Sequence, residues 1–200
     1  FKIYSLEKIK NDEKLTIYIE GDGMSWVDRF TISSDPTPNN PTAFKLALID
    51  SNDNVIYLAR PCQFEWSNNC NKDTWTLSQY SNSVLSGYKS IIEELSMKHK
   101  EIHLVGYSGG AGIAMYLGSI NNQSISSIRT VAGNINHNAL TKLLNITDLR
   151  NSLNFYPIIK KTNKIPQIHY YGLEDKVVPN KLQISYKNQN ADNNCINISS

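Results

Sequence analysis

The chain has 200 residues, a formal net charge of +2 and no run of basic residues, so the sequence gives no support to a nucleic-acid partner. No apolar stretch reaches the length of a membrane span. A chain of this length is typical of one domain with a substantial core, and we expect a single domain over residues 1–200. The composition leaves the oligomeric state open.

The first residue is Phe1 rather than methionine, so we expect that an N-terminal segment was removed or omitted. A secretory or lipoprotein signal would fit in that place. The localisation therefore stays open, with export slightly favoured over the cytoplasm.

The first half of the chain alternates between strand-like and helix-like segments. Leu15–Glu20 is rich in β-branched and aromatic residues, which is typical of a strand. Ser81–His99 is the clearest helix, because its apolar residues recur on one face. The other segments expected here are an edge strand at Phe1–Ser5, a short buried helix at Phe44–Ile49 and a strand at Val55–Ala59.

The second half continues this alternation. Strands are expected at Ile102–Val105 and Ile125–Val131, and helices around Ala111–Leu117 and Ala139–Leu144. Thr147–Lys164 has a mixed composition that would suit a small cap over a site. The last expected elements are a strand at Pro166–Gly172, a helix at Asn180–Gln189 and a strand that begins at Asn194. The alternation predicts an α/β domain with a mostly parallel sheet and helices on both faces.

A G-x-S-x-G motif lies between the strand at Ile102–Val105 and the helix that follows it, with Ser108 at the centre. A serine on such a tight turn has a strained backbone, and the glycines two residues before and after it let neighbouring backbone pass closely. The helix N-terminus points free N–H groups and a partial positive charge at whatever is bonded to Ser108. The motif therefore predicts a nucleophile elbow, the alternative being an ordinary glycine–serine turn.

Two glycines follow the strand at Leu15–Glu20, in the segment Gly21–Met24. A turn of this kind lets a backbone N–H point inward, and elbow hydrolases take their second oxyanion-hole donor from this place. The first donor is the N–H of the residue after the nucleophile. We therefore expect an oxyanion hole built from Gly109, Asp22 and Gly23, the alternative being a simple strand-end turn capped by Asp22.

Two further polar segments follow predicted strands and would lie at the same end of the sheet as Ser108. Asn134 and His137 belong to a turn after one strand, and Asp175 comes just past the end of another. Sites in open parallel sheets form beyond the carboxyl ends of the strands. Asp175 is thus well placed to reach toward the neighbouring strand ends, and Asn134 and His137 are candidates for the pocket wall.

The chain contains three cysteines. Cys62 and Cys70 lie close together in a polar, loop-like segment that lacks metal-ligand spacing, which favours a disulfide if the protein is exported. The alternative is a pair of reduced thiols in a cytosolic protein. Cys195 falls in the expected last strand, where we expect it to be buried.

Several motifs, spread over nearly the whole chain, carry a resemblance to a known family: YIEGDGMSW, SSDPTPNNP, YLARPCQF, LVGYSGGAG, VAGNINH and GLEDKVVP. They resemble the α/β-hydrolase fold, and more closely a group of uncharacterised bacterial α/β-hydrolases that are often exported or lipoprotein-like. The resemblance implies that Ser108 is the nucleophile and Asp175 the acid. It also implies that the N–H groups of Gly109 and of the Gly21–Met24 turn hold the oxyanion.

The catalytic histidine of this family normally lies in the loop after the last strand, whereas this chain stops at Ser200 as that strand finishes. We expect either that a continuation carries the histidine or that the chain is a C-terminally truncated product with little activity. His137 is the alternative base, although hydrogen bonds to Asn134 or Asn136 suit it better. The other histidines are expected in surface or structural places: His99 exposed at a helix end, and His103 and His169 inside strands.

These observations predict a serine hydrolase that acts on an ester or related small acyl substrate through an acyl-enzyme at Ser108, without a metal or an organic cofactor. The alternative is a catalytically impaired remnant or binding module, motivated by the missing terminal histidine. A flavodoxin-like or nucleotide-binding domain is disfavoured, because the glycines do not follow the phosphate-binding spacing. Acyl and alcohol specificity, and the choice between ester, thioester and amide, are left open.

Overall fold

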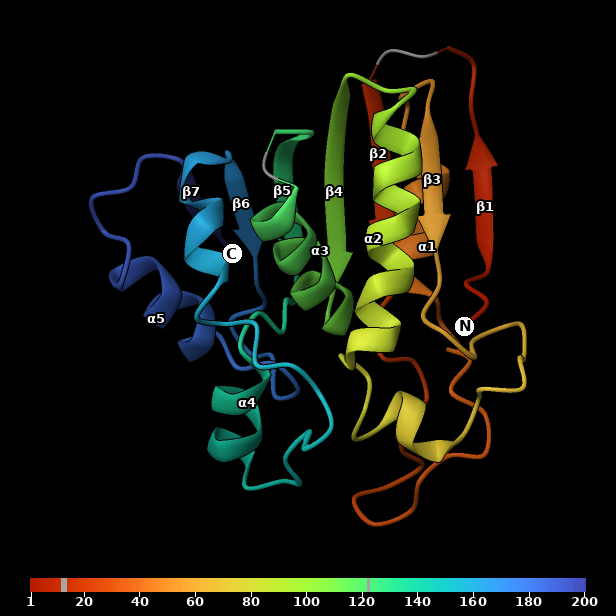
Figure 1. Ribbon diagram of the computed structural model, residues 1–200. Coiled ribbons are helices and arrows are strands. Elements are labelled where there is room, and N and C mark those ends of the chain that lie inside the picture. Colours follow the sequence, from red (N-terminus) through yellow and green to blue (C-terminus); the bar gives the residue numbers. More distant parts are fainter. Residues whose placement is uncertain (12–13, 122) are drawn as a thin grey trace.

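The computed structural model describes residues 1–11, 14–121 and 123–200 and contains one seven-stranded sheet (Figure 1). The strand order across the sheet is β1-β3-β2-β4-β5-β6-β7. All neighbouring strands are parallel except β1, which runs antiparallel to β3 at one edge. The strands are β1 (Ser5–Lys8), β2 (Lys14–Ile19), β3 (Val55–Leu58), β4 (Glu101–Tyr107), β5 (Ile125–Val131), β6 (Gln167–Tyr170) and β7 (Ile196–Ser199).

The predicted mostly parallel sheet is confirmed, and one predicted strand is displaced. The edge strand expected at Phe1–Ser5 begins only at Ser5, and all residues of β1 are exposed. Tyr4 contributes one backbone acceptor, because its carbonyl oxygen receives the N–H of Ala59. An edge strand is fixed by backbone pairing with its single neighbour rather than by an apolar face, so the apolar pattern placed it too early.

Helices cover both faces of the sheet, as expected. In Figure 1, α2 and α3 lie in front of the sheet and α1 lies behind it. No helix among the described residues is long and apolar enough to cross a membrane. The helices are α1 (Thr42–Ile49), α2 (Asn82–Ser96), α3 (Gly109–Ile120), α4 (His137–Leu144) and α5 (Lys181–Asn188), with 3-10 turns η1 (Lys72–Trp75) and η2 (Ile159–Lys164).

The larger part of the core lies between the sheet and the face that carries α2 and α3. The helix predicted from its apolar stripe, α2, buries Val84, Leu85, Tyr88 and Ile92 there. Ten of the twelve residues of α3 are buried, because this helix is enclosed by the sheet, α2 and η2. A helix this deeply enclosed holds its N-terminus in one place, which fixes the position of the preceding turn.

The opposite face has a smaller cluster in which α1 packs on β2 and β3. The short helix expected to be buried here is buried only on one side. Its Ala43 and Ala47 face the sheet, whereas Leu48 and Ile49 are 66% and 79% exposed. On the same face, beyond α1, Arg129 of β5 and Tyr170 of β6 are exposed. A segment rich in apolar residues therefore did not mean an enclosed helix.

Candidate active site

Ser108 occupies the turn between β4 and α3, with φ +48° and ψ −118°. A positive φ is a strained conformation for a residue with a side chain. A Cβ on Gly106 would lie 2.5 Å from the Cα of Ala111, and a Cβ on Gly110 would overlap the backbone at the end of β2. The close packing of α3 on β2 and β4 thus forces the tight strand–turn–helix geometry that the G-x-S-x-G motif predicts.

Neighbouring backbone holds this turn from the β5 side. The N–H of Ser108 donates to the carbonyl oxygen of Val131 at 2.9 Å, and the N–H of Asn134 donates to the carbonyl oxygen of Ser108 at 2.9 Å. Both peptide groups of the strained residue are therefore anchored. The side chain is the part of Ser108 that is left to face the cavity described below.

Substitution of Gly110 tests how much this packing matters. We expect Gly110→Ala to lower the free energy of unfolding by about 2 kcal/mol, because the added methyl group pushes α3 away from β2. The matched control is Gly87→Ala in α2, where the added Cβ meets nothing nearer than 3.5 Å. That variant is expected to gain about 0.5–1 kcal/mol from its better helix propensity. Denaturant unfolding followed by circular dichroism measures both, and equal stabilities would contradict the packing argument.

The loop after β2 is organised by Glu20, whose side chain is 1% exposed. Its carboxylate accepts the N–H of Gly21 at 2.9 Å and the N–H groups of Ala43 and Phe44 at 3.3 and 3.4 Å. A carboxylate at the N-terminus of α1 satisfies free backbone donors and is favoured by the helix dipole. Glu20 therefore fixes the end of β2 and occupies the N–H of Gly21.

The next two residues of this loop keep their backbone donors free. Within the described part of the chain, the N–H groups of Asp22 and Gly23 have no acceptor. Gly23 has φ +63°, a conformation that suits glycine. Gly109 is the first residue of α3, where backbone N–H groups have no partner within the helix. Donors are thus available in the three residues that the sequence assigned to an oxyanion hole.

The loop and the elbow are in direct contact. A Cβ on Gly109 would overlap the carboxylate of Asp22, so this carboxylate lies against the backbone of the residue after Ser108. The alternative reading, in which Asp22 caps its own turn, is wrong for the side chain. Its Oδ1 accepts a hydrogen bond from the Nη1 of Arg60 at 2.7 Å instead, because a buried guanidinium is the stronger partner.

A cavity of about 650 Å³ lies beside Ser108 at the carboxyl ends of the strands. Polar side chains of Glu20, Asp22 and Asn134 contribute to its wall near the serine. Apolar side chains from α4 and the adjacent loops form another part of the wall, among them Leu77, Leu140, Leu144, Ile146 and Leu149, and the charged residues Asp28 and Arg29 also line the cavity. In Figure 1, α4 lies below the sheet, on the side to which β4 points. The cavity is large enough for a small organic substrate.

The expected cap at Thr147–Lys164 is only partly a cap. Thr147 and Leu149 line the cavity, as a cap would. The later part of the segment forms η2, whose Ile159 and Thr162 are buried and which packs against α3. Its mixed composition thus reflects two environments in one segment.

Asp175 lies in the loop after β6, at the same end of the sheet as Ser108. Its Oδ1 accepts the N–H groups of Val177 and Val178 at 2.8 and 2.9 Å, which holds the carboxylate in a fixed orientation. Val177 also lines the cavity beside Ser108. The loop of Asp175 therefore borders the same cavity, although no direct contact joins its carboxylate to Ser108 among the described residues.

His137 is not among the residues that line the cavity, although the sequence made it a candidate for the pocket wall. Its ring stacks on Tyr80 at 5.3 Å, and its Nε2 is 3.0 Å from the carbonyl oxygen of Leu153. Burial lowers the pKa of His137, since the charged ring would lose its hydration. The expected hydrogen bonds to Asn134 or Asn136 are absent from the described residues. Asn136 instead accepts the N–H of Ala139, as the N-cap of α4.

The other three histidines are bound within the fold. His169 is enclosed between Thr130 and Gln167, and burial lowers its pKa to about 4. His103 bonds the hydroxyl of Ser127 on β5. The expectation that His99 is exposed is wrong, since only 4% of it is accessible. A helical pattern does not reveal whether the residues just beyond the helix end are covered by the rest of the fold.

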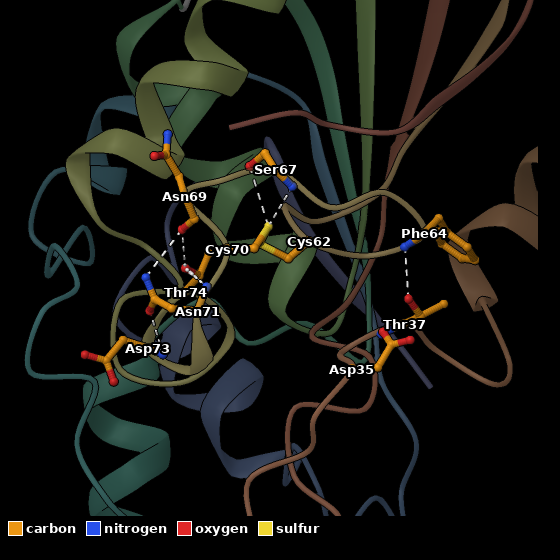
Figure 2. Close-up of a disulfide and its surroundings, with 10 residues drawn as sticks. All are labelled: Asp35, Thr37, Cys62, Phe64, Ser67, Asn69, Cys70, Asn71, Asp73 and Thr74. Atoms are coloured by element: carbon orange, nitrogen blue, oxygen red, sulfur yellow. Dashed lines mark hydrogen bonds between the residues drawn. A yellow bond between two sulfur atoms is a disulfide. The ribbon is translucent and has the colours of Figure 1, made fainter.

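A disulfide joins Cys62 to Cys70 in the loop after β3, with 5.7 Å between the Cα atoms (Figure 2). The N–H of Phe64, inside this loop, donates to the Oγ1 of Thr37 at 2.9 Å. Arg60 and Gln63 of the same segment reach the Gly21–Gly23 loop, so the disulfide closes a loop that begins beside the cavity. Cys195 is a free thiol and only half-buried, since it precedes β7 instead of lying within it.

Sequence reasoning gave no role to four residues that support this site. They are Glu20, Arg60, Gln63 and Tyr80, all of them 5% exposed or less. A charged residue directly at the end of a strongly apolar strand is a usable signal, because a buried charge requires a partner. Both Glu20 and Arg60 stand in such positions, at the ends of β2 and β3.

The architecture and the serine turn define an α/β protein with a strained strand–turn–helix at Ser108 beside a large cavity. Neither a family model nor a curated protein sequence matches the chain. Comparison with solved structures identifies the α/β-hydrolase fold. The esterase Est1E from Butyrivibrio proteoclasticus, solved with ferulic acid, has a TM-score of 0.63 and 10% identity, over 98% of this chain and 84% of that one.

Two further structures have the same fold. A study of carboxylesterases from the thaumarchaeon Nitrososphaera gargenis supplies one, with a TM-score of 0.61 and 12% identity, over 98% of this chain and 84% of the other. An alpha-beta serine hydrolase homologue from Coxiella burnetii has a TM-score of 0.57 and 15% identity, over 99% and 80%. At these identities the likeness establishes the fold.

Proposed function

We propose that this protein is a serine hydrolase that cleaves an ester or related acyl substrate through an acyl-enzyme at Ser108. The observation that carries the proposal is the strained turn of Ser108, at φ +48°, beside the cavity of about 650 Å³. Strain of this kind persists where the surrounding structure holds it, and it is concentrated at functional sites. The hydrolase fold and its esterase neighbours are consistent with this chemistry.

In the proposed reaction, the Oγ of Ser108 attacks the acyl carbon and the carbonyl oxygen becomes an oxyanion. The N–H of Gly109 and those of Asp22 and Gly23 are free to stabilise this charge, and the N-terminus of α3 adds a favourable dipole. The alcohol leaves with a proton, and water then hydrolyses the acyl-enzyme. Because the N–H of Gly21 donates to Glu20, it is not free to bind the oxyanion. The loop donors are therefore those of Asp22 and Gly23.

The reaction requires a base for the serine proton and a carboxylate that orients the base. We assign the carboxylate to Asp175, whose Oδ1 is held by two backbone N–H groups while its Oδ2 has no partner in the described part of the chain. The base belongs in a loop after β7, because β7 is the neighbour of β6 and Asp175 follows β6. His137 is a poorer candidate, since it faces Tyr80 and Leu153.

The residues that line the cavity indicate which kind of substrate would fit it. Leu140, Leu144, Ile146 and Leu149 offer an apolar surface, which suits an acyl or alcohol group that is hydrophobic. Glu20, Asp22 and Asn134 lie near Ser108, where the reacting carbonyl would be placed, and Asp28 and Arg29 add charged groups to the lining. An ester with one apolar substituent fits the apolar part of this lining.

A second candidate function is a binding module that has kept the cavity and lost catalysis. It is favoured by one observation, namely that none of the four histidines contacts Ser108 in the described part of the chain. The same cavity would then hold a small acyl compound without cleaving it.

A fluorophosphonate probe separates the two candidates, because it reacts with an activated serine and not with a passive one. We expect the full-length protein to be labelled at Ser108, identified by mass spectrometry of the modified peptide. Labelling should disappear after heat unfolding, which destroys the oxyanion hole. A folded protein that stays unlabelled over hours would contradict the serine hydrolase and favour the binding module.

A further inference from the structure

Arg60 follows Ala59, two residues after the end of β3. It is a buried cation with no part in the reaction described above. Its side chain is 6% exposed, and its guanidinium makes two short hydrogen bonds. Nη1 donates to the Oδ1 of Asp22 at 2.7 Å, and Nη2 donates to the carbonyl oxygen of Gln79 at 2.7 Å. An arginine is charged at every physiological pH, so this is a permanent positive charge inside the protein.

The same guanidinium also lies over Tyr80, with its Cζ 5.0 Å from the ring centroid. Tyr80 is completely buried, and its hydroxyl donates to the carbonyl oxygen of Gly109 at 3.1 Å. Through Tyr80, Arg60 is therefore connected to the carbonyl group of Gly109, the residue that follows Ser108. Through Asp22, it is connected to the other side of the proposed oxyanion hole.

The backbone of Arg60 strengthens the connection to the loop. Its N–H donates to the Oε1 of Gln63 at 3.0 Å, and the Nε2 of Gln63 donates to the carbonyl oxygen of Gly21 at 3.0 Å. The side chain of Arg60 thus holds Asp22, and its backbone holds Gly21 through Gln63. The disulfide between Cys62 and Cys70 begins within this segment and limits its movement.

We propose that Arg60 is a positioning residue for the oxyanion hole: buried between the Asp22 loop and Tyr80, it holds the two donor segments together and neutralises the carboxylate of Asp22. The inference rests on the proposed function. Its electrostatic part follows from the contact between Asp22 and Gly109, which places a negative charge beside the donors that bind a negative oxygen. An unneutralised carboxylate in this place would oppose the oxyanion in a poorly hydrated site.

The test uses Arg60→Met, Arg60→Lys and the double variant Arg60→Met/Asp22→Asn in the full-length protein. We expect Arg60→Met to lower kcat and the rate constant for fluorophosphonate labelling about 10- to 100-fold, since the loss of one oxyanion-hole donor has an effect of this order or larger. KM for a p-nitrophenyl ester should change by less than about threefold, because substrate binding in the ground state does not form an oxyanion. Arg60→Lys keeps the charge, so its kcat should lie between that of the wild type and that of Arg60→Met.

The double variant distinguishes positioning and neutralisation from a general structural role. Removing the carboxylate of Asp22 should restore part of kcat, about three- to tenfold over Arg60→Met, since the repulsion disappears. Tyr80→Phe, which keeps the ring and removes one hydroxyl, is a milder variant that should fold and should lose about threefold in kcat.

Folded variants with unchanged kcat would overturn the inference. It would also be overturned if the loss of kcat in Arg60→Met were only as large as the loss of folded protein and were not relieved by Asp22→Asn. If Arg60→Met does not fold, Arg60→Lys and Tyr80→Phe decide, and unchanged kcat in both overturns the inference. A wild-type protein that is not labelled at all contradicts the proposed function instead. The two failures are therefore distinguishable.

Discussion

Replacement of Ser108 by alanine is expected to lower ester hydrolysis by about 10⁴-fold or more and to abolish fluorophosphonate labelling. The size of the effect follows from the loss of the nucleophile that forms the acyl-enzyme, without which an oxyanion hole gives only weak residual catalysis. The alanine should fold normally, because the backbone conformation of the turn is imposed by α3 and β5. Hydrolysis of a p-nitrophenyl ester measures the loss.

Two controls accompany this variant. Ser86→Ala changes an exposed serine of α2 and should leave both hydrolysis and labelling unchanged. Ser108→Gly should be as inactive as the alanine variant but more stable by about 1 kcal/mol, since glycine accepts φ +48° without strain. Retained hydrolysis in Ser108→Ala would remove Ser108 from the mechanism, whatever the stability of the variant.

Replacement of Asp175 by asparagine is expected to lower kcat by about 10³-fold in the full-length protein. The amide oxygen can still accept the N–H groups of Val177 and Val178, so the loop should keep its shape. What disappears is the negative charge that orients and stabilises the protonated base, and this loss is large in serine hydrolases. Steady-state hydrolysis and the rate of labelling by a fluorophosphonate should fall together.

The control for this variant is Glu174→Gln, which removes one negative charge from the neighbouring, exposed position. We expect hydrolysis to be unchanged, because the charge of Glu174 is screened by solvent. Equal activities of Asp175→Asn and Glu174→Gln would contradict the assignment of Asp175 and direct attention to the other acidic groups at the cavity, Glu20 and Asp22.

The interior strands and the turn at Ser108 could be predicted from the sequence, because each depends on a local pattern of residues. The apolar run expected as a strand at Val55–Ala59 marks a buried parallel strand, and β3 is found there at Val55–Leu58 with all of its residues buried. The glycines around Ser108 predict that the helix and the strand approach each other closely. The first strand was missed by several residues, because β1 is exposed on both faces and carries no apolar pattern.

Other predictions failed where the answer depended on distant parts of the chain. His99 ends a helix and is nevertheless buried, and His137 bonds Leu153 instead of the nearby asparagines. The side chain of Asp22 turns to Arg60, 38 residues further along the chain, and not to its own turn. For Asp22 and His137 the outcome was decided by a partner that becomes a neighbour only after folding.

The amino-acid sequence alone determined the alternation of strands and helices and the sharp bend at Ser108, since hydrophobic periodicity and glycine spacing act over a few residues. Only the tertiary structure decided which charges face one another around that bend. Arg60, Asp22 and Tyr80 come from three segments, and a buried charge must find its partner wherever the fold brings one within hydrogen-bonding distance. The local sequence can mark such a charge, as it does at Glu20 and Arg60, but it does not show which partner the charge will find.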